Sequence, residues 1–136
     1  MMEKDSLIRF DQYTLITRHL IMPNELNPNY SIFGGQLIAW LDKDLYVFVS
    51  GQLKYKTMVT ISMNKVYFKN PAYLGEVIEI YGALSRIRRS SVTTKGRAIA
   101  VDPETEERRT IIECEITYVA VNEKGKPQGV FKNLVK

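Results

Sequence analysis

The residues from Gly34 to about Ser50 form a helical pattern that is apolar on nearly every face, and this pattern sets the strongest limit on the fold. Large apolar side chains recur at steps of three and four residues, at Leu37, Trp40, Leu41, Leu45 and Phe48. Other apolar residues fill the remaining faces, namely Ile38, Ala39, Val47 and Val49. A helix of this kind is buried on all sides, so the rest of the chain must enclose it. We expect the helix to end at Gly51.

The segments around this helix are rich in β-branched and aromatic residues, which is typical of strands. Residues 7–22 are predicted to form one strand that ends at Pro23, because proline has no N–H for the ladder. Residues 24–35 are dense in Asn, Pro and Gly and predict an ordered loop. Four β-rich runs follow the helix, at 57–69, 76–89, 91–101 and 108–122. Their short breaks favour antiparallel hairpins, so we predict an α+β fold in which a curved sheet encloses one helix.

The chain of 136 residues is predicted to form a single domain, 1–136, whose polar end at 126–136 is expected to fray. One cysteine excludes an intramolecular disulfide, and together with one histidine it argues against a metal site. No apolar run reaches the roughly 20 residues of a membrane helix. The acidic start also lacks the basic and apolar regions of a signal peptide. We therefore expect no membrane partner and a cytoplasmic location.

Positive charge is concentrated in one stretch of the chain. The 19 basic and 15 acidic residues give a formal net charge of +4, which by itself identifies no partner. From Ala83 to Val101 there is no acid, but there are five basic residues: Arg86, Arg88, Arg89, Lys95 and Arg97. Such a stretch indicates either a site for a phosphorylated ligand or nucleic acid, or a solvated strand face. No groove-reading helix or stacking motif accompanies it, so we expect no nucleic-acid partner.

Asp42 is the residue that fits least well into the apolar helix. A buried ionised carboxylate is costly unless it is paired or hydrogen-bonded. Either Asp42 lies with Lys43 and Asp44 on a wet strip of the helix, or it is a base or nucleophile at a cleft. Gly34 and Gly35 open the helix, where the first N–H groups can stabilise a carbonyl oxygen that gains charge. Together these residues are a candidate acyl-transfer site.

A block of motifs leads up to Asp42: Asn27-Pro28-Asn29, then Ile32-Phe33-Gly34-Gly35 and Leu37. This block resembles the hotdog-fold acyl-CoA thioesterases, of the bacterial single-domain broad-range type that is related to brain-type acyl-CoA hydrolases. Further agreement lies at Val59-Thr60, Phe68, Pro71, Gly75-Glu76, Arg89-Ser90-Ser91 and 117–121. The resemblance covers about residues 18–126. The family commonly has glycine where Tyr30 stands here.

The resemblance implies a hotdog fold, in which a five-stranded antiparallel sheet wraps around one long central helix. It also implies an acyl-CoA substrate, no cofactor beyond that coenzyme A, and homodimers that often assemble as trimers of dimers. In this family the active sites lie at the dimer interface. By position, Asp42 corresponds to the general base or nucleophile, and Asn27 to the amide that acts across the interface. Gly35 corresponds to the oxyanion N–H, while Gly34 and the Arg89-Ser90-Ser91 motif correspond to contacts with coenzyme A.

We therefore expect an acyl-CoA thioesterase that releases a free carboxylic acid and coenzyme A. The alternative is a non-catalytic hotdog protein that binds acyl-CoA as a sensor or regulator. A hotdog dehydratase would need a catalytic histidine, and His19 is in the wrong place. His19 is expected at the surface or an interface, and Cys114 in the core. Four glutamates that alternate with apolar residues predict a solvated sheet face: Glu76, Glu79, Glu113 and Glu115.

Overall fold

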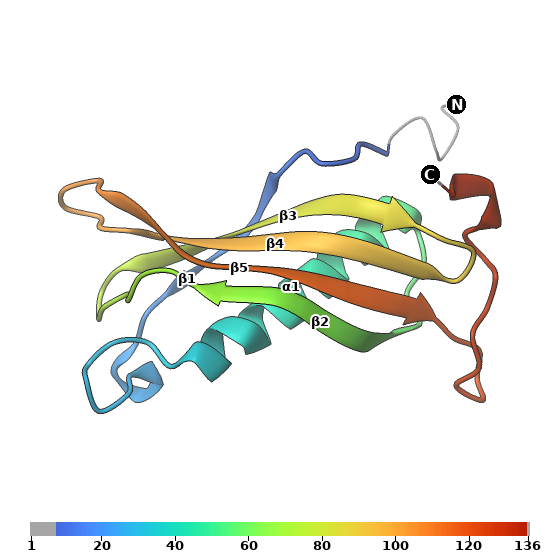
Figure 1. Ribbon diagram of the computed structural model, residues 1–136. Helices are drawn as coiled ribbons and strands as arrows, with labels where there is room; N and C mark the ends of the chain where they lie inside the picture. Colours follow the sequence, from blue (N-terminus) through green and yellow to red (C-terminus); the bar gives the residue numbers. More distant parts are fainter. Residues whose placement is uncertain (1–7, 136) are drawn as a thin grey trace.

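The computed structural model describes residues 8–135 as one sheet and one long helix (Figure 1). The chain runs through β1 (Thr14–Leu20), η2 (Pro23–Glu25), α1 (Gly34–Leu53), β2 (Met58–Phe68), β3 (Val77–Ile87), β4 (Ser91–Val101), β5 (Arg108–Ala120) and η3 (Lys132–Leu134). The sheet has the order β1-β3-β4-β5-β2, and each neighbouring pair is antiparallel. The predicted α+β class, with an antiparallel sheet around a single long helix, is confirmed.

The four strands after the helix begin and end within two residues of their predicted bounds, but the first strand and the end of the helix differ more. The first strand spans only Thr14–Leu20 rather than 7–22. The prediction that the helix ends at Gly51 is wrong, because the helix continues to Leu53. Lys54 ends it in a left-handed conformation (φ 56°), with its N–H donating to the Ser50 carbonyl. Gly51 is exposed with open space around it, and the helix continues through this residue.

The inner face of the sheet packs against α1, and the helix supplies the buried side chains Leu37, Trp40, Leu41, Leu45, Val49 and Leu53. The prediction that the helix is buried on all sides is wrong for one face, since Ala39, Lys43 and Val47 are exposed. Cys114 on β5 is buried, as predicted. Among the described residues, no helix combines the length and apolar character needed to cross a membrane.

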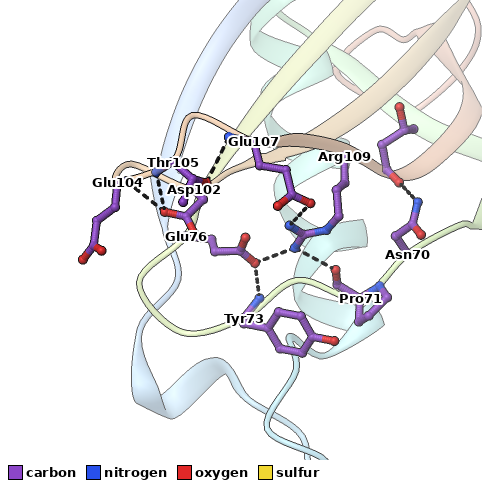
Figure 2. Close-up of polar contacts among 10 residues, drawn as sticks. Asn70, Pro71, Tyr73, Glu76, Asp102, Glu104, Thr105, Glu107 and Arg109 are labelled. Atoms are coloured by element: carbon purple, nitrogen blue, oxygen red, sulfur yellow. Dashed lines mark hydrogen bonds and ion pairs between the residues drawn. The ribbon is translucent and has the colours of Figure 1, made fainter.

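The loop between β2 and β3 is fastened to the sheet by a buried ion pair (Figure 2). Glu76 Oε1 accepts hydrogen bonds from Arg109 on β5 (2.7 Å) and from the Tyr73 N–H (2.7 Å). Glu79 is also buried and pairs with Arg108 (2.6 Å). The predicted solvated face is therefore wrong for Glu76 and Glu79, because arginines of β5 compensate their charges.

The C-terminal tail packs against the turn between β3 and β4. Phe131 is 1% exposed, and its N–H donates to the Arg89 carbonyl oxygen (2.9 Å). Its ring contacts Tyr55 edge-on, with centroids 5.7 Å apart. The tail is thus anchored more firmly than its polar composition indicates.

Candidate active site

Asp42 lies on α1 in a half-buried niche between the helix and strands β2 and β5. Its Oδ1 accepts a hydrogen bond from the Thr60 hydroxyl (2.8 Å). The Tyr118 hydroxyl lies 2.6 Å from the Asp42 carbonyl oxygen and 3.3 Å from Oδ1. Burial, and then the neighbouring Asp42 charge, raise the pKa of Tyr118, so this hydroxyl remains a donor. Both hydroxyls contact Oδ1 of this half-buried carboxylate, and its Oδ2 has no hydrogen-bond partner within residues 8–135.

Asn27 organises the loop before the helix. Its Oδ1 accepts hydrogen bonds from the Asn29 N–H (2.8 Å) and the Ser31 N–H (3.2 Å). Its Nδ2 donates to the Ser31 hydroxyl (3.0 Å) and has a second hydrogen for another partner. Within the loop, Tyr30 has a left-handed backbone (φ 63°) and is 77% exposed. Glycine adopts this conformation without strain, whereas the Cβ of a tyrosine makes it less favourable.

Gly34 and Gly35 form the first turn of α1 and differ in their surroundings. Neither N–H has a hydrogen-bond acceptor among residues 8–135, and no side chain caps this end of the helix. A Cβ on Gly34 would lie 2.9 Å from the Phe68 ring, whereas a Cβ on Gly35 would meet open space. The N–H groups at this helix end are thus free to bind an oxygen that carries negative charge.

A single chain does not bring the Asp42 carboxylate and the Gly35 N–H together. Gly35 and Asp42 are seven residues apart on α1, a rise of about 10 Å along the helix axis. Thr60, which holds Asp42, lies near the start of β2, whereas Phe68, which packs on Gly34, is its last residue. Each end of β2 therefore carries one half of the predicted site.

A cavity of about 300 Å³ adjoins the helix start. Ile32, Gly34 and Leu37 line one side of it, and 68–71 with Ile111 line the other. The lining is largely apolar. A short hydrocarbon chain is the kind of group that this cavity can hold.

The predicted coenzyme A motif forms the turn between β3 and β4. The Ser91 carbonyl accepts from the Arg88 N–H (2.8 Å), and the Ser90 carbonyl accepts from the Ala120 N–H (2.7 Å). The Arg89 side chain is exposed, beside Gly129, with no ion pair to a described residue. This turn lies at the Asp42 end of the sheet, because Tyr118 pairs with Val92.

Asp44 belongs to a polar cluster that the sequence did not predict. Its Oδ2 accepts from the Thr17 hydroxyl (2.6 Å) and lies 2.7 Å from His19 Nε2. The His19 ring stacks on Trp40, with centroids 4.3 Å apart. Of the two alternatives left open for Asp42, the wet strip shared with Asp44 is wrong, because Asp44 is buried and faces β1 while Asp42 faces β2 and β5. The spacing of four between Trp40 and Asp44, which puts both on one helix face, was the available signal.

Within the described chain, no group of three or more His, Cys, Asp and Glu side chains is arranged to hold a metal ion. The chemistry available to these residues is that of a carboxylate, an amide and free helix N–H groups. A carboxylate that activates water, combined with N–H donors for an oxyanion, is suited to acyl transfer.

The chain is similar in sequence and fold to known proteins. Residues 30–107 match the model of the thioesterase superfamily. An uncharacterized acyl-CoA thioester hydrolase of Haemophilus influenzae is 28% identical over 120 residues, which cover 85% of this chain and 77% of that protein. The acyl-CoA thioester hydrolase YciA of Escherichia coli is 28% identical, with 88% and 92% covered. The crystal structure of a hexameric hotdog fold thioesterase of Campylobacter jejuni superposes with a TM-score of 0.78 at 27% identity, with 88% and 92% covered. The hotdog fold implied by the sequence is thereby confirmed.

Proposed function

Because this chain belongs to the thioesterase superfamily, we propose that it hydrolyses acyl-CoA thioesters to a free carboxylic acid and coenzyme A. The observation that carries this proposal is the setting of Asp42. Its half-buried carboxylate is held by Thr60 and Tyr118, on a helix that begins with free N–H groups. The names of the relatives, which are acyl-CoA thioester hydrolases, support the same substrate class.

The active site is completed by a second copy of the chain. β2 is an edge strand, and its exposed apolar side chains are Val59, Ile61, Tyr67 and Phe68. Antiparallel pairing of two β2 strands about Asn64 would place Thr60 opposite Phe68 of the second copy, because both lie four residues from Asn64. Asp42 of one copy then approaches the helix start of the other. A homodimer is the functional unit, and the hexameric relative supports a trimer of dimers.

In this dimer Asp42 acts in one of two ways. As a general base, it takes a proton from water, whose oxygen attacks the thioester carbonyl carbon. As a nucleophile, it attacks that carbon itself and forms an anhydride, which water then hydrolyses. In both routes the C–S bond breaks and the departing thiolate of coenzyme A takes up a proton. No metal or prosthetic group is needed for this chemistry.

The second copy supplies the groups that bind the carbonyl. The Gly35 N–H stabilises the negative charge on its oxygen, since this N–H is free and reachable by a ligand. The remaining Nδ2 hydrogen of Asn27 orients the water or the thioester. The cavity beside Gly34 receives the acyl chain, and Arg89, Ser90 and Ser91 contact coenzyme A.

The test is a thiol-release assay on acyl-CoAs from acetyl to palmitoyl, with wild type and Asp42→Asn side by side. We expect Asp42→Asn to lower turnover by at least about 100-fold, because the amide is neither a base nor a nucleophile. Burial raises the pKa of the Cys114 thiol to about 12, so the protein's own thiol adds little background.

Asp102→Asn is the matched control, because Asp102 sits in the turn between β4 and β5 and its Oδ1 accepts from the Glu104 N–H. An asparagine keeps that hydrogen bond, so turnover should be unchanged. A folded Asp42→Asn enzyme that retains wild-type turnover would refute the catalytic assignment. Acyl-CoA binding by the wild type without turnover of any substrate would favour the sensor instead.

A further inference from the structure

The side chain of Glu76 folds back over the loop between β2 and β3 (Figure 2). Gly75 has a positive φ of 83°, which glycine adopts without strain, and the turn it allows ends with the Glu76 N–H donating to the Tyr73 carbonyl (3.1 Å). Glu76 Oε1 then accepts both from the Tyr73 N–H (2.7 Å) and from Arg109 (2.7 Å). One oxygen of a buried residue thus ties the Tyr73 peptide to β5.

Arg109 holds the same loop at a second point. Its Nη2 donates to the Pro71 carbonyl (3.2 Å), and its guanidinium lies 5.7 Å from the centre of the Tyr73 ring. The Arg109 side chain is partly exposed, and its Nη1 lies 3.7 Å from Glu107. Arg109 therefore keeps an acidic neighbour and contact with water when Glu76 is replaced, so the substitution leaves no isolated buried charge.

The loop between β2 and β3 is in turn bonded to residues 24–33, which we call the Asn27 loop. Tyr73 lies opposite Ser31 in an antiparallel bridge, and the Ile32 N–H donates to the Ala72 carbonyl (2.8 Å). Apart from this bridge, the backbone hydrogen bonds of the Asn27 loop stay within residues 22–37 in the part of the chain that the structure describes. The bridge is therefore what ties the loop to the sheet by hydrogen bonds.

Ser31, the bridge residue, also holds the Asn27 side chain. The Ser31 N–H donates to Asn27 Oδ1 (3.2 Å), and Asn27 Nδ2 donates to the Ser31 hydroxyl (3.0 Å). A continuous series of contacts therefore runs from Arg109 on β5 through Glu76 and Tyr73 to the Asn27 amide.

We infer that Glu76 is a positioning residue, which holds the Asn27 amide in place through the two loops. The inference rests on the proposed function, in which the amide of one copy orients the water or the thioester at Asp42 of the other copy. Precise placement matters for such a group, because a displacement of about 1 Å can cost about 100-fold in rate.

The acyl cavity depends less on Glu76. Its wall at 69–71 is attached to β5 separately, because the Lys69 N–H donates to the Ile111 carbonyl (2.7 Å). Asn70 Nδ2 also donates to a carbonyl of β5 (2.8 Å). Loss of the Glu76 carboxylate should therefore lower kcat while KM changes little.

Hydrogen exchange of the folded protein, followed by mass spectrometry, tests the link between the loops without any turnover. The variant is Glu76→Ala. Glu79→Ala is the matched control, because Glu79 is equally buried and pairs with an arginine of β5, but its side-chain partners lie on strands. We expect the amides of the Asn27 loop to exchange at least about tenfold faster in Glu76→Ala than in the wild type, and Glu79→Ala to leave them unchanged. Equal exchange of this loop in the two variants would overturn the inference.

Steady-state thiol release then tests the consequence for turnover. We expect Glu76→Ala to lower kcat at least about tenfold with KM within about threefold of the wild type, and Glu79→Ala to keep both values. Glu76→Gln retains an oxygen that can accept both hydrogen bonds, so it should restore most of the kcat. An unchanged kcat in Glu76→Ala, or equal losses in Glu76→Ala and Glu79→Ala, would show that Glu76 positions nothing in the site.

A second pair of variants covers the case in which Glu76→Ala does not fold. Glu76→Leu with Arg109→Met replaces the whole ion pair by apolar side chains, which buried pairs often tolerate, and Glu79→Leu with Arg108→Met is its control. The same exchange and kcat criteria apply. A wild type that hydrolyses no acyl-CoA would refute the proposed function, whereas the exchange experiment would still decide whether Glu76 holds the Asn27 loop. The two proposals therefore fail separately.

Discussion

Three carboxylates of the described chain are buried, and each one has a specific cationic or imidazole partner. Glu76 and Glu79 pair with arginines from β5, and Asp44 pairs with His19 from β1. A buried charge left without its partner is strongly destabilising, so these residues tie distant segments together. They link β5 to β3 and to the loop before it, and β1 to α1.

Glu79 gives a pH-dependent prediction. Burial alone would raise its pKa, but hydrogen bonds from Tyr81 and Arg108, together with the arginine charges, hold the pKa below the ordinary 4.5. A lowered carboxyl pKa contributes stability above the unfolded value, and that stability is lost as the pH falls through the folded value. We expect Glu79→Gln to lower the free energy of unfolding by about 1 kcal/mol at pH 7, and by less near pH 3.

Urea unfolding of wild type and variant across this pH range measures the difference. Glu104→Gln, an exposed carboxylate of the turn between β4 and β5, serves as the control and should leave the profile unchanged. A Glu79→Gln deficit that stays constant from pH 7 to pH 3 would show that ionisation of Glu79 is not the source of the stability.

Sequence reasoning picked out the residues of the proposed site that lie in one continuous motif. Asp42 stood out because a carboxylate interrupts an apolar helix, and Gly34 and Gly35 stood out because they open it. The pair of His19 and Asp44 was missed because its members are 25 residues apart and meet only through packing of β1 on α1. Pairing of Glu76 with Arg109 spans 33 residues and was invisible for the same reason.

At the level of the elements, two glycines allow α1 to approach the sheet. A Cβ on Gly82 of β3 would lie 2.6 Å from Leu45 Cδ2 and 2.6 Å from Ile16 Cδ1. A Cβ on Gly96 of β4 would lie 2.8 Å from Leu45 Cδ1. Leu45 is fully buried, so it cannot move aside into solvent. The strand pattern predicted a sheet around a helix, but this close approach depends on side chains from three elements.

Gly82→Ala and Gly51→Ala make a matched pair of variants. We expect Gly82→Ala to lower the free energy of unfolding by about 1–3 kcal/mol, because the added methyl group overpacks the core. Gly51→Ala should raise it by about 0.5–1 kcal/mol, because alanine loses less backbone freedom in an exposed helix with open space. Denaturant unfolding at one protein concentration compares them. Equal stability of Gly82→Ala and wild type would mean that Leu45 and Ile16 shift without cost.

For the whole molecule, the two edges of the sheet differ in what they expose. On β2, Ile61 is 57% exposed, next to other exposed apolar residues of the same strand. The shorter β1, at the opposite edge, exposes two large apolar side chains, Leu15 (44%) and Leu20 (54%), whereas β2 exposes four. A long apolar edge strand is normally covered by another strand. Sequence patterns located β2 but did not place it at the edge of the sheet. The order of strands depends on which strands pair, and the pattern within a single strand does not reveal this.

Ile61→Lys should therefore break the assembly, since a lysine on a paired edge strand would be buried without a partner. Light scattering should show smaller species than the wild type, and thioesterase turnover should fall with the loss of assembly. Leu15→Lys places the same charge on β1 and should leave both the assembly and the turnover unchanged. An Ile61→Lys protein of wild-type size would mean that β2 is not the contact between copies.

The proposed site between two copies would also allow two inactive proteins to restore one another. A dimer of one Asp42→Asn chain and one Asn27→Ala chain has one site that carries both changes and one that carries neither. If subunits mix at random, half of the dimers are mixed and half of their sites are intact, so about a quarter of wild-type turnover should return. The measurement is thiol release after co-refolding, compared with each variant refolded alone. If Asp42 and Asn27 served a site within one chain, every site would carry one change, and the mixture would be no more active than the average of its components.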